Sequence, residues 1–455
     1  MLTYILKRLL YFIPTFLVIS LIVFFLSKAA GEFLNCELDP KGPDPEICRA
    51  EAHLKGYDLP VFYFSVTTAA YPDTLYKVFR PERRAVLQEL VGQHGNWTRI
   101  NDYYQQLRAL EDMISRDDRV EEQLTRAGKT VQQLLIKSRP EAIKSLLNQL
   151  TDIAKNRAID AEIGQRITQL NGAYRQMVEE ATPHLHWLPA LHWYGLNNQY
   201  HRWLSRFLMG DFGVSVRDQR PVRDKIADRL PWTLYLTLPS ILLAYLLSIP
   251  IGVYSATRPN SQRTVLLDRF LLFLYSLPTF WIGTLLVVFF TTPEYGLKLF
   301  PSVDTPGTHL TAANAPKLIL PIFCLTYGTL AFMSRQVRSS MREALQQDYI
   351  RTARAKGLSE SVVVWRHAFP NALFPLITIF GAVLPAAFGG SVVIESIFNI
   401  NGIGWLMLNS ITARDWPVVY AILMIAAVLT MVGLLIADLL YIVADPRVRL
   451  GEKQP

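Results

Sequence analysis

Charged residues are scarce in this chain. Only 18% of its 455 residues are Asp, Glu, Lys or Arg, and 51% are hydrophobic. A soluble globular domain has about 25% charged residues. The deficit excludes an ordinary soluble protein and indicates segments buried in a bilayer. The net charge of +8 gathers beside the apolar runs, so it reports membrane orientation rather than nucleic-acid binding.

Cysteine is also rare. Three cysteines are too few for a metal-binding framework, and we expect no metal site. Cys36 and Cys48 lie close together among Pro and Gly residues, and an oxidising compartment would let them form a disulfide. The alternative is two unpaired thiols. Cys324 lies inside an apolar run and is expected to be a packing residue.

Catalytic motifs are missing as well. The chain has no Gly-x4-Gly-Lys-Ser/Thr loop to cradle a nucleotide phosphate. It also has no Ser/His/Asp or Cys/His set at a plausible spacing. We therefore expect neither an enzyme nor a bound cofactor, and a partner has to hydrolyse any ATP that the protein uses.

Apolar runs long enough to cross a membrane are abundant. Basic residues flank alternate ends of these runs, so the positive-inside rule places both termini in the cytoplasm. Parity then makes residues 31 to about 230 extracytoplasmic. A signal peptide cleaved after Ser27-Lys28-Ala29 is the alternative for the first run. The runs lie near residues 9–29, 233–256, 265–291, 318–339, 372–394 and 417–443.

These runs divide the chain into a transmembrane helix at residues 1–30, an insert at 31–210 and a five-helix core at 211–455. Within the insert, apolar residues at steps of three and four predict at least one antiparallel helical hairpin at about 81–180. Gly128 reads as a helix end and Ser138-x-x-Glu141 as a capping box. The two stripes are Ile100, Tyr103, Leu107, Leu110 and Ile114, and Ile163, Ile167, Leu170, Tyr174 and Met177.

A second polar segment of the insert, residues 184–203, is dense in Trp, His and Tyr. That composition is typical of a membrane–water interface.

A basic loop at about 341–371 separates the fourth and fifth runs. Its pattern predicts a short amphipathic helix that stops at Gly357, followed by a second short helix that ends before Pro370. Tyr349, Ile350, Ala353 and Leu358 are expected to form an apolar strip, beside basic side chains that can pair with acidic groups of a partner.

The loop resembles the EAA loop of ABC-importer permeases, and its residue sequence is similar to that of the dipeptide/oligopeptide branch. Arg351-Thr352-Ala353 stands where the family has Glu-Ala-Ala, so the namesake Glu is absent. Further segments fit in the same order. They are Lys7-Arg8-Leu9-Leu10, Gly210-Asp211-Phe212-Gly213, Ser276-x-Pro278, Gly389-Gly390-x-Val392-x-x-Glu395 and Asp445-Pro446-Arg447.

The resemblance implies a six-helix, all-α permease of the type I importer kind in the bacterial inner membrane. It also implies two ABC ATPase subunits, a second homologous permease subunit and an extracytoplasmic substrate-binding protein as partners, besides membrane lipid. The insert has no counterpart in the family pattern. Coupling to the ATPase would rest on Tyr349, Ile350, Arg351, Ala353, Arg354, Ala355, Lys356, Gly357, Leu358 and Pro370.

Helix-breaking and ionisable residues inside the apolar runs are candidates for a translocation pathway or gate. Simple close packing, or a cap or salt bridge in the case of the carboxylate, is the alternative. The candidates are Pro278, Pro385, Gly389, Gly390 and Glu395.

The sequence thus predicts the permease subunit of an ATP-driven importer for peptides or a related small solute. Two other classes remain open. An ion-coupled secondary transporter would need inverted repeats and charges at the membrane centre, and neither is evident. A membrane-anchored extracytoplasmic scaffold would use the insert as its working part.

Overall fold

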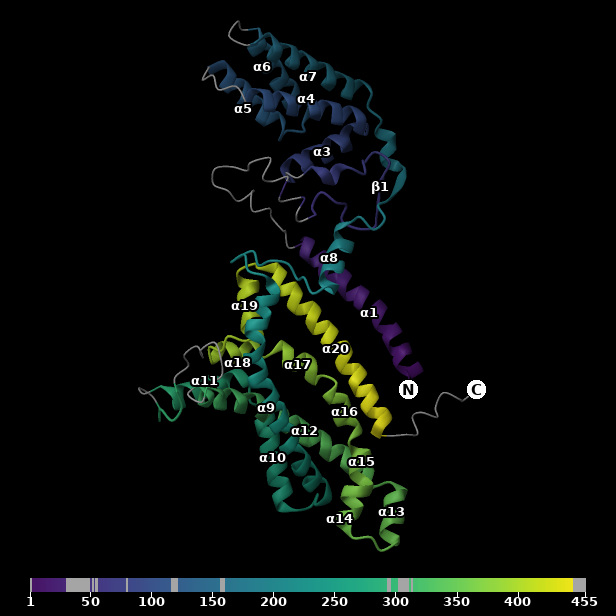
Figure 1. Ribbon diagram of the computed structural model, residues 1–455, viewed down its shortest axis with the longest axis vertical. Helices are drawn as coiled ribbons and strands as arrows, with labels where there is room; N and C mark the ends of the chain where they lie inside the picture. Colours follow the sequence, from purple (N-terminus) through teal and green to yellow (C-terminus); the bar gives the residue numbers. More distant parts are fainter. Residues whose placement is uncertain are drawn as a thin grey trace. The chain divides into compact units, whose positions relative to one another are not determined.

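The structure is a computed structural model that describes residues 2–29, 50, 53, 56–78, 81–115, 122–155, 160–292, 296–301, 311 and 314–444. The chain divides into two compact units (Figure 1). Met1–Gly31 and Met209–Pro455 form the membrane unit, and Glu32–Leu208 form the insert unit. The membrane unit is therefore assembled from two separated parts of the sequence.

The membrane unit is built from helices, and the predicted helical membrane fold is confirmed. Among the described residues, five of its helical segments are long and apolar enough to cross a bilayer, or six if the bent pair α10–α11 is one span. Four of the five are the helices α1 (Leu2–Ala29), α9 (Val222–Thr257), α12 (Ile319–Leu345) and α20 (Trp416–Ala444), and the fifth is the segmented stretch Phe374–Ile397. The bent pair is α10 (Gln262–Ser276) and α11 (Thr279–Thr291). Shorter ones are η4 (Ala315–Leu318), α16 (Phe374–Phe380), α17 (Val383–Gly389), α18 (Val392–Ile397) and α19 (Ile403–Thr412).

The third predicted span is broken in the middle. Helices α10 and α11 meet at an angle of 90°. Leu277, between them, has an extended backbone with ψ 124°. A residue before proline avoids the helical region because the ring of the proline collides with its backbone. Pro278, which the sequence marks as a helix-breaking residue within this run, therefore explains the break.

Two close helix pairs hold the membrane unit together. Helices α9 and α12 approach so closely that a Cβ on Gly252 would lie 2.5 Å from the Cβ of Val337. Helix α1 lies along α20, where the Tyr420 hydroxyl donates a 3.1 Å hydrogen bond to the Leu26 carbonyl and Arg8 pairs with Asp438 at 3.0 Å. The N-terminal helix thus packs against the last helix of this unit.

The insert unit has its own helical core. Both predicted stripes are confirmed, since their residues are buried, apart from Ile114, which is partly buried and packs against them. The helices are α3 (Pro81–His94), α4 (Trp97–Ser115), α5 (Glu122–Leu134), α6 (Pro140–Ala154), α7 (Ala161–Glu179) and α8 (Gln199–Leu208).

Two predicted helix boundaries in the insert are wrong. Gly128 lies within α5 rather than at a helix end, because the apolar stripe of Leu124, Ala127, Val131 and Leu134 continues across it and is buried. Helix α6 does start with Pro140 in its first turn, but no side chain caps it. The Ser138 hydroxyl donates to the carboxylate of Glu89 in α3 instead.

The insert also contains a small β-ribbon that the sequence did not reveal. Strands β1 (Phe64–Thr68) and β2 (Pro189–Trp193) pair antiparallel, with Phe64 opposite Trp193 and Thr68 opposite Pro189. The 3-10 turns η2 (Leu75–Lys77) and η3 (Pro183–Trp187) flank it. The two strands are more than a hundred residues apart, so they are not joined by a short turn whose residues would predict a hairpin.

Candidate functional site

The basic loop folds into a chain of short helices at one end of the membrane unit (Figure 1). The first helix, α13 (Asp348–Ala355), ends before Gly357, which adopts a φ of +76°. L-residues with a side chain rarely adopt this conformation, so Gly357 makes the predicted stop. The chain then continues through α14 (Glu360–Val362), the π-helical η5 (Val363–Ala368) and α15 (Phe369–Ala372).

The second helix of the loop passes through Pro370 rather than ending before it, which corrects the prediction. In a regular α-helix the proline ring would collide with the carbonyl four residues earlier, and the amide hydrogen bond would be lost. Here the preceding residues, Val363–Ala368, form a wider π-helical turn. Such a turn changes the hydrogen-bond register and gives the proline room.

The apolar strip expected on the loop is different in the structure. Ile350 and Ala353 are buried at 0% and 5% exposure, and they pack with Val363, Val364 and Ala368 and with side chains of α9 and α12. They hold the loop to the transmembrane helices and are not available to a partner. The exposed apolar side chains of the loop are Tyr349, Leu358, Val362 and Trp365.

The basic residues of the loop are exposed, as a docking surface would require. Arg354 makes a two-pronged ion pair with Glu360, at 2.8 and 3.3 Å, which ties α13 to α14. Arg351 lies 3.5 Å from Asp348 in the first turn of α13. Ala355 and Lys356 are exposed as well. Since exposed ion pairs contribute about 1 kcal/mol or less, these charges remain free to exchange partners.

Glu395 is buried where three helices of the membrane unit meet. Its carboxylate accepts a 3.1 Å hydrogen bond from the Thr233 hydroxyl of α9 and a 2.8 Å bond from the Trp405 amide in the first turn of α19. The Thr233 oxygen in turn accepts a 2.7 Å bond from the Ile403 amide. A carboxyl oxygen and a hydroxyl at a helix start satisfy amides that have no partner within the helix. Glu395 thus joins α9, α18 and α19.

Glycines make room for this carboxylate. A Cβ on Gly402 would lie 2.6 Å from the Glu395 carboxyl carbon, and a Cβ on Gly404 would lie 3.1 Å from one of its oxygens. Gly390, with a φ of +63°, also approaches the carboxylate closely. Packing around this buried carboxylate therefore requires Gly390, Gly402 and Gly404, whereas a Cβ on Gly389 would meet nothing within 4 Å.

A second buried carboxylate belongs to Asp415, which was not among the candidates predicted from the sequence. It lies between α19 and α20 and is 1% exposed. It accepts hydrogen bonds from the Ser215 hydroxyl at 2.6 Å and the Val216 amide at 3.0 Å, and Lys225 of α9 lies 3.3 Å away. Burial would raise the pKa of Asp218, but Lys225, 3.0 Å away, and the hydrogen bond from the Arg220 amide lower it to about 2.

Comparisons with known proteins agree with this architecture. Residues 248–450 match the family model "Binding-protein-dependent transport system inner membrane component". The chain is 44% identical over 263 residues to the oligopeptide transport system permease protein AppB of Bacillus subtilis, covering 56% of this chain and 82% of AppB. The chain belongs to this family. It is a multi-pass inner-membrane transport protein.

Two further relatives show the same coverage. The dipeptide transport system permease protein DppB of Lactococcus lactis is 39% identical over 57% of this chain and 84% of its own length. The glutathione transport system permease protein GsiC of Salmonella paratyphi A is 35% identical over 56% of this chain and 80% of its own length. The family match includes the loop and Glu395 but begins after Ser215 and Lys225.

The remaining pathway candidates mark helix interruptions. Pro278 follows the 90° bend between α10 and α11. Pro385 lies in the first turn of α17, which ends at Gly389, and Gly390 is the following cap. The structure brings Gly390 close to Glu395. A role of Pro278 and Pro385 in a translocation pathway stays a prediction. Cys36 and Cys48 lie outside the described residues, and Cys324 is a buried free thiol.

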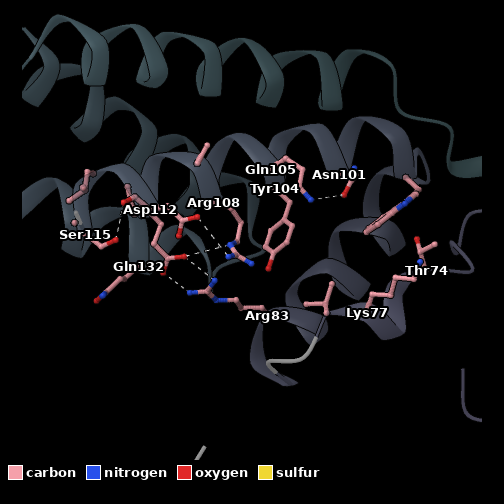
Figure 2. Close-up of a pocket in the computed structure, with 17 residues that line it drawn as sticks. Thr74, Lys77, Arg83, Asn101, Tyr104, Gln105, Arg108, Asp112, Ser115 and Gln132 are labelled. Carbon is pink, nitrogen blue, oxygen red and sulfur yellow. Dashed lines mark hydrogen bonds and ion pairs between the residues drawn. The ribbon is translucent and has the colours of Figure 1, made fainter. Parts of the chain in front are cut away.

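The insert unit contains a cavity of about 770 Å³ between α3, α4 and α5 (Figure 2). Basic side chains on its wall are already paired. Arg83 donates two hydrogen bonds to Glu111, at 3.0 and 2.6 Å, and Arg108 lies 4.0 Å from both Glu111 and Asp112. The Arg83–Glu111 pair joins α3 to α4, the Arg108 pairs lie within α4, and a structural role accounts for all of them.

Proposed function

We propose that this protein is the permease subunit of an ATP-driven importer that carries peptides or a related small solute. The observation that supports this most is the 44% identity to AppB over 82% of that protein's length. DppB and GsiC, whose names refer to dipeptides and glutathione, support the same class of cargo. Family membership favours this function over an ion-coupled transporter and over a membrane-anchored scaffold.

The loop at about 341–371 is the proposed contact with a cytoplasmic ABC ATPase. Its exposed surface combines the apolar side chains Tyr349, Leu358, Val362 and Trp365 with Arg351, Arg354 and Lys356. Apolar anchors within a charged rim are typical of protein–protein contacts.

The loop is also packed to transmit motion. Ile350 and Ala353 of α13 lie in one hydrophobic cluster with Val337 of α12 and Val253 of α9. Displacement of the loop by a closing ATPase pair would therefore move the closely packed helices α9 and α12 together, since packed cores shift as units rather than deform.

The remaining proposed partners are a second homologous permease subunit, a substrate-binding protein and membrane lipid; nucleic acid is not among them. The proposed orientation has both termini in the cytoplasm and the insert unit outside it. A reporter that is active only outside the cytoplasm should work when fused within residues 108–115 or 122–155. It should fail when fused after Gly357, and activity there would overturn the orientation.

Co-purification tests the coupling proposal. Val362→Glu and Trp365→Glu place acids in the exposed surface of the loop and should abolish recovery of the ATPase and uptake of peptide, while the permease remains in the membrane. Val178→Glu is the matched control, because Val178 and Val362 are 39% and 37% exposed. Normal ATPase recovery with both loop variants would remove this surface from the mechanism.

A further inference from the structure

One face of the β1–β2 ribbon in the insert unit is apolar and open. In β-strands alternate side chains point to opposite faces, and paired residues lie on the same face. Phe64 pairs with Trp193, and Val66 pairs with Leu191. These four side chains are 42%, 71%, 69% and 69% exposed, respectively. The rings of Phe64 and Trp193 stack, with an interplanar angle of 3°.

The other face of the ribbon is turned toward the insert unit. Ser65, Thr67, Ala190 and His192 are each partly buried. Neither strand contains Asp, Glu, Lys or Arg. The outward face therefore has no charge to attract water or an oppositely charged protein. Contiguous apolar surface of this kind marks a contact with a protein or with a membrane.

The ribbon lies beside both ends of the insert unit. The entering chain and the leaving helix α8 are joined by hydrogen bonds, from Gln199 to the Leu59 carbonyl at 2.7 Å and from Arg202 to the His53 carbonyl at 3.3 Å. The ribbon adjoins this junction, since the Tyr194 amide donates to the Tyr63 carbonyl at 2.8 Å. Within the unit, α6 and α7 lie at the end away from α8 (Figure 1).

Both ends of the insert unit continue into membrane spans. The first candidate span ends at Lys28, and the second begins at Val222. Helix α8 is about 15 Å long at 1.5 Å per residue, and it ends in the exposed Leu208. Along the chain the ribbon is thus nearer to both spans than the core helices are, since α3 begins only at Pro81 and α7 already ends at Glu179.

We propose that the ribbon face formed by Phe64, Val66, Leu191 and Trp193 inserts into the headgroup boundary of the lipid bilayer. Tryptophan is enriched at this depth because its ring is apolar and its N–H can reach water, and small apolar faces bind there without crossing the membrane. The exposed Trp187 just before β2 adds a second indole. This proposal rests on the membrane location of the chain and not on its cargo.

Lipid photolabelling tests the proposal. The full-length protein is reconstituted in nanodiscs of phosphatidylethanolamine and phosphatidylglycerol, with a lipid that carries a diazirine on its acyl chain. After illumination, peptides with covalently attached lipid are identified by mass spectrometry. We expect adducts on β1 and β2 as well as on α1, which serves as the positive control, and none on the buried stripe of α4.

Two double variants test whether the lipid adducts depend on the apolar face of the ribbon. Leu191→Glu with Trp193→Glu should remove the ribbon adducts and leave those of α1. Ile136→Glu with Val178→Glu is the matched control, because these side chains are also apolar and exposed but lie among the helices of the insert. It should keep the ribbon adducts. Hydrogen exchange of α4 and α7 reports whether each variant is folded. If the Leu191→Glu, Trp193→Glu double variant is unfolded, Leu191→Ser is the milder replacement.

The proposal fails if α1 is labelled and the wild-type ribbon is not. It also fails if the ribbon amides become protected from exchange only when a substrate-binding protein is added, since the face would then be a protein-docking surface. Loss of the ribbon adducts in the control pair would show that the labelling is indirect, and it would overturn the proposal as well.

Discussion

The hydroxyl of Ser215 donates a 2.6 Å hydrogen bond to the carboxylate of Asp415, 200 residues further along the chain. Lys225 lies within reach of both groups, at 2.9 Å from the hydroxyl and 3.3 Å from the carboxylate. The segment that leads into α9 is thereby fixed to the connection between α19 and α20. Because Ser215 and Asp415 are buried, each depends on this cluster for its hydrogen bonds.

Replacing Asp415 by Asn should loosen this segment. The partly buried ammonium of Lys225 would lose one of its two carboxylate partners, the other being Asp218 at 3.0 Å. We expect a local cost of about 2 kcal/mol, which is about thirtyfold faster hydrogen exchange at the amide of Val216. Asp228→Asn is the control, since its pair with Arg220 is exposed and should contribute about 0.5 kcal/mol. Equal exchange in both variants would contradict the assignment.

The glycines around Glu395 give a second prediction. Gly402→Ala would place a Cβ 2.6 Å from the carboxyl carbon, so Glu395 or Thr233 has to move. We expect a loss of about 2 kcal/mol, as for other overpacked sites, and a lower melting temperature in detergent. Gly389→Ala is the matched control, because nothing lies within 4 Å of its Cβ position. An unchanged melting temperature for Gly402→Ala would mean that the carboxylate is not held as the structure indicates.

Local patterns carried the part of this fold that could be predicted. The stripes beginning at Ile100 and Ile163 were found because helical periodicity is written in neighbouring residues. Gly357 was found because a stop between two helical patterns needs a residue that tolerates positive φ. The apolar runs located the spans, and Pro278 marked the one that breaks.

The features that could not be predicted depend on contacts between residues that are far apart in the sequence. No residue near Asp415 in the sequence indicates that Ser215 is its partner, and no residue near Phe64 indicates that it pairs with Trp193. Ile350 and Trp365 look alike as apolar residues of an amphipathic loop. Their burial is decided by α9 and α12, which cover the first and leave the second exposed. Periodicity gives the faces of a helix but not which face its neighbours cover.

A third prediction concerns pH. Burial lowers the pKa of His94, and its Nε2 atom has no hydrogen-bond partner among the described residues. The unfolded histidine, with a pKa of about 6.5, binds a proton more readily than the folded one. Stability is therefore full above about pH 6.5 and falls as the pH decreases below it. Hydrogen exchange near the C-terminal end of α3 should speed up on acidification.

His94→Asn is the control for this effect. It removes the titrating group, so exchange in α3 should no longer depend on pH between about 5 and 7 beyond the intrinsic change of amide chemistry. The same acid-induced acceleration in the variant would assign the pH dependence to another group.

The last prediction uses the backbone of Gly357. Its φ is +76° and no atom lies within 4 Å of its Cβ position, so a substitution there acts through backbone strain alone. Asn tolerates this conformation, and Ala pays about 1 kcal/mol. Pro is locked near −65° and also loses the amide that donates to the Arg354 carbonyl at 2.9 Å. ATPase recovery and peptide uptake should therefore fall in the order Gly, Asn, Ala, Pro, while the amount of permease in the membrane stays constant. Crowding cannot produce that order, because Asn is larger than Ala and is expected to function better. If Pro transports as well as Gly, the turn is not part of the coupling mechanism. If Asn is worse than Ala, side-chain size rather than backbone conformation governs the loop.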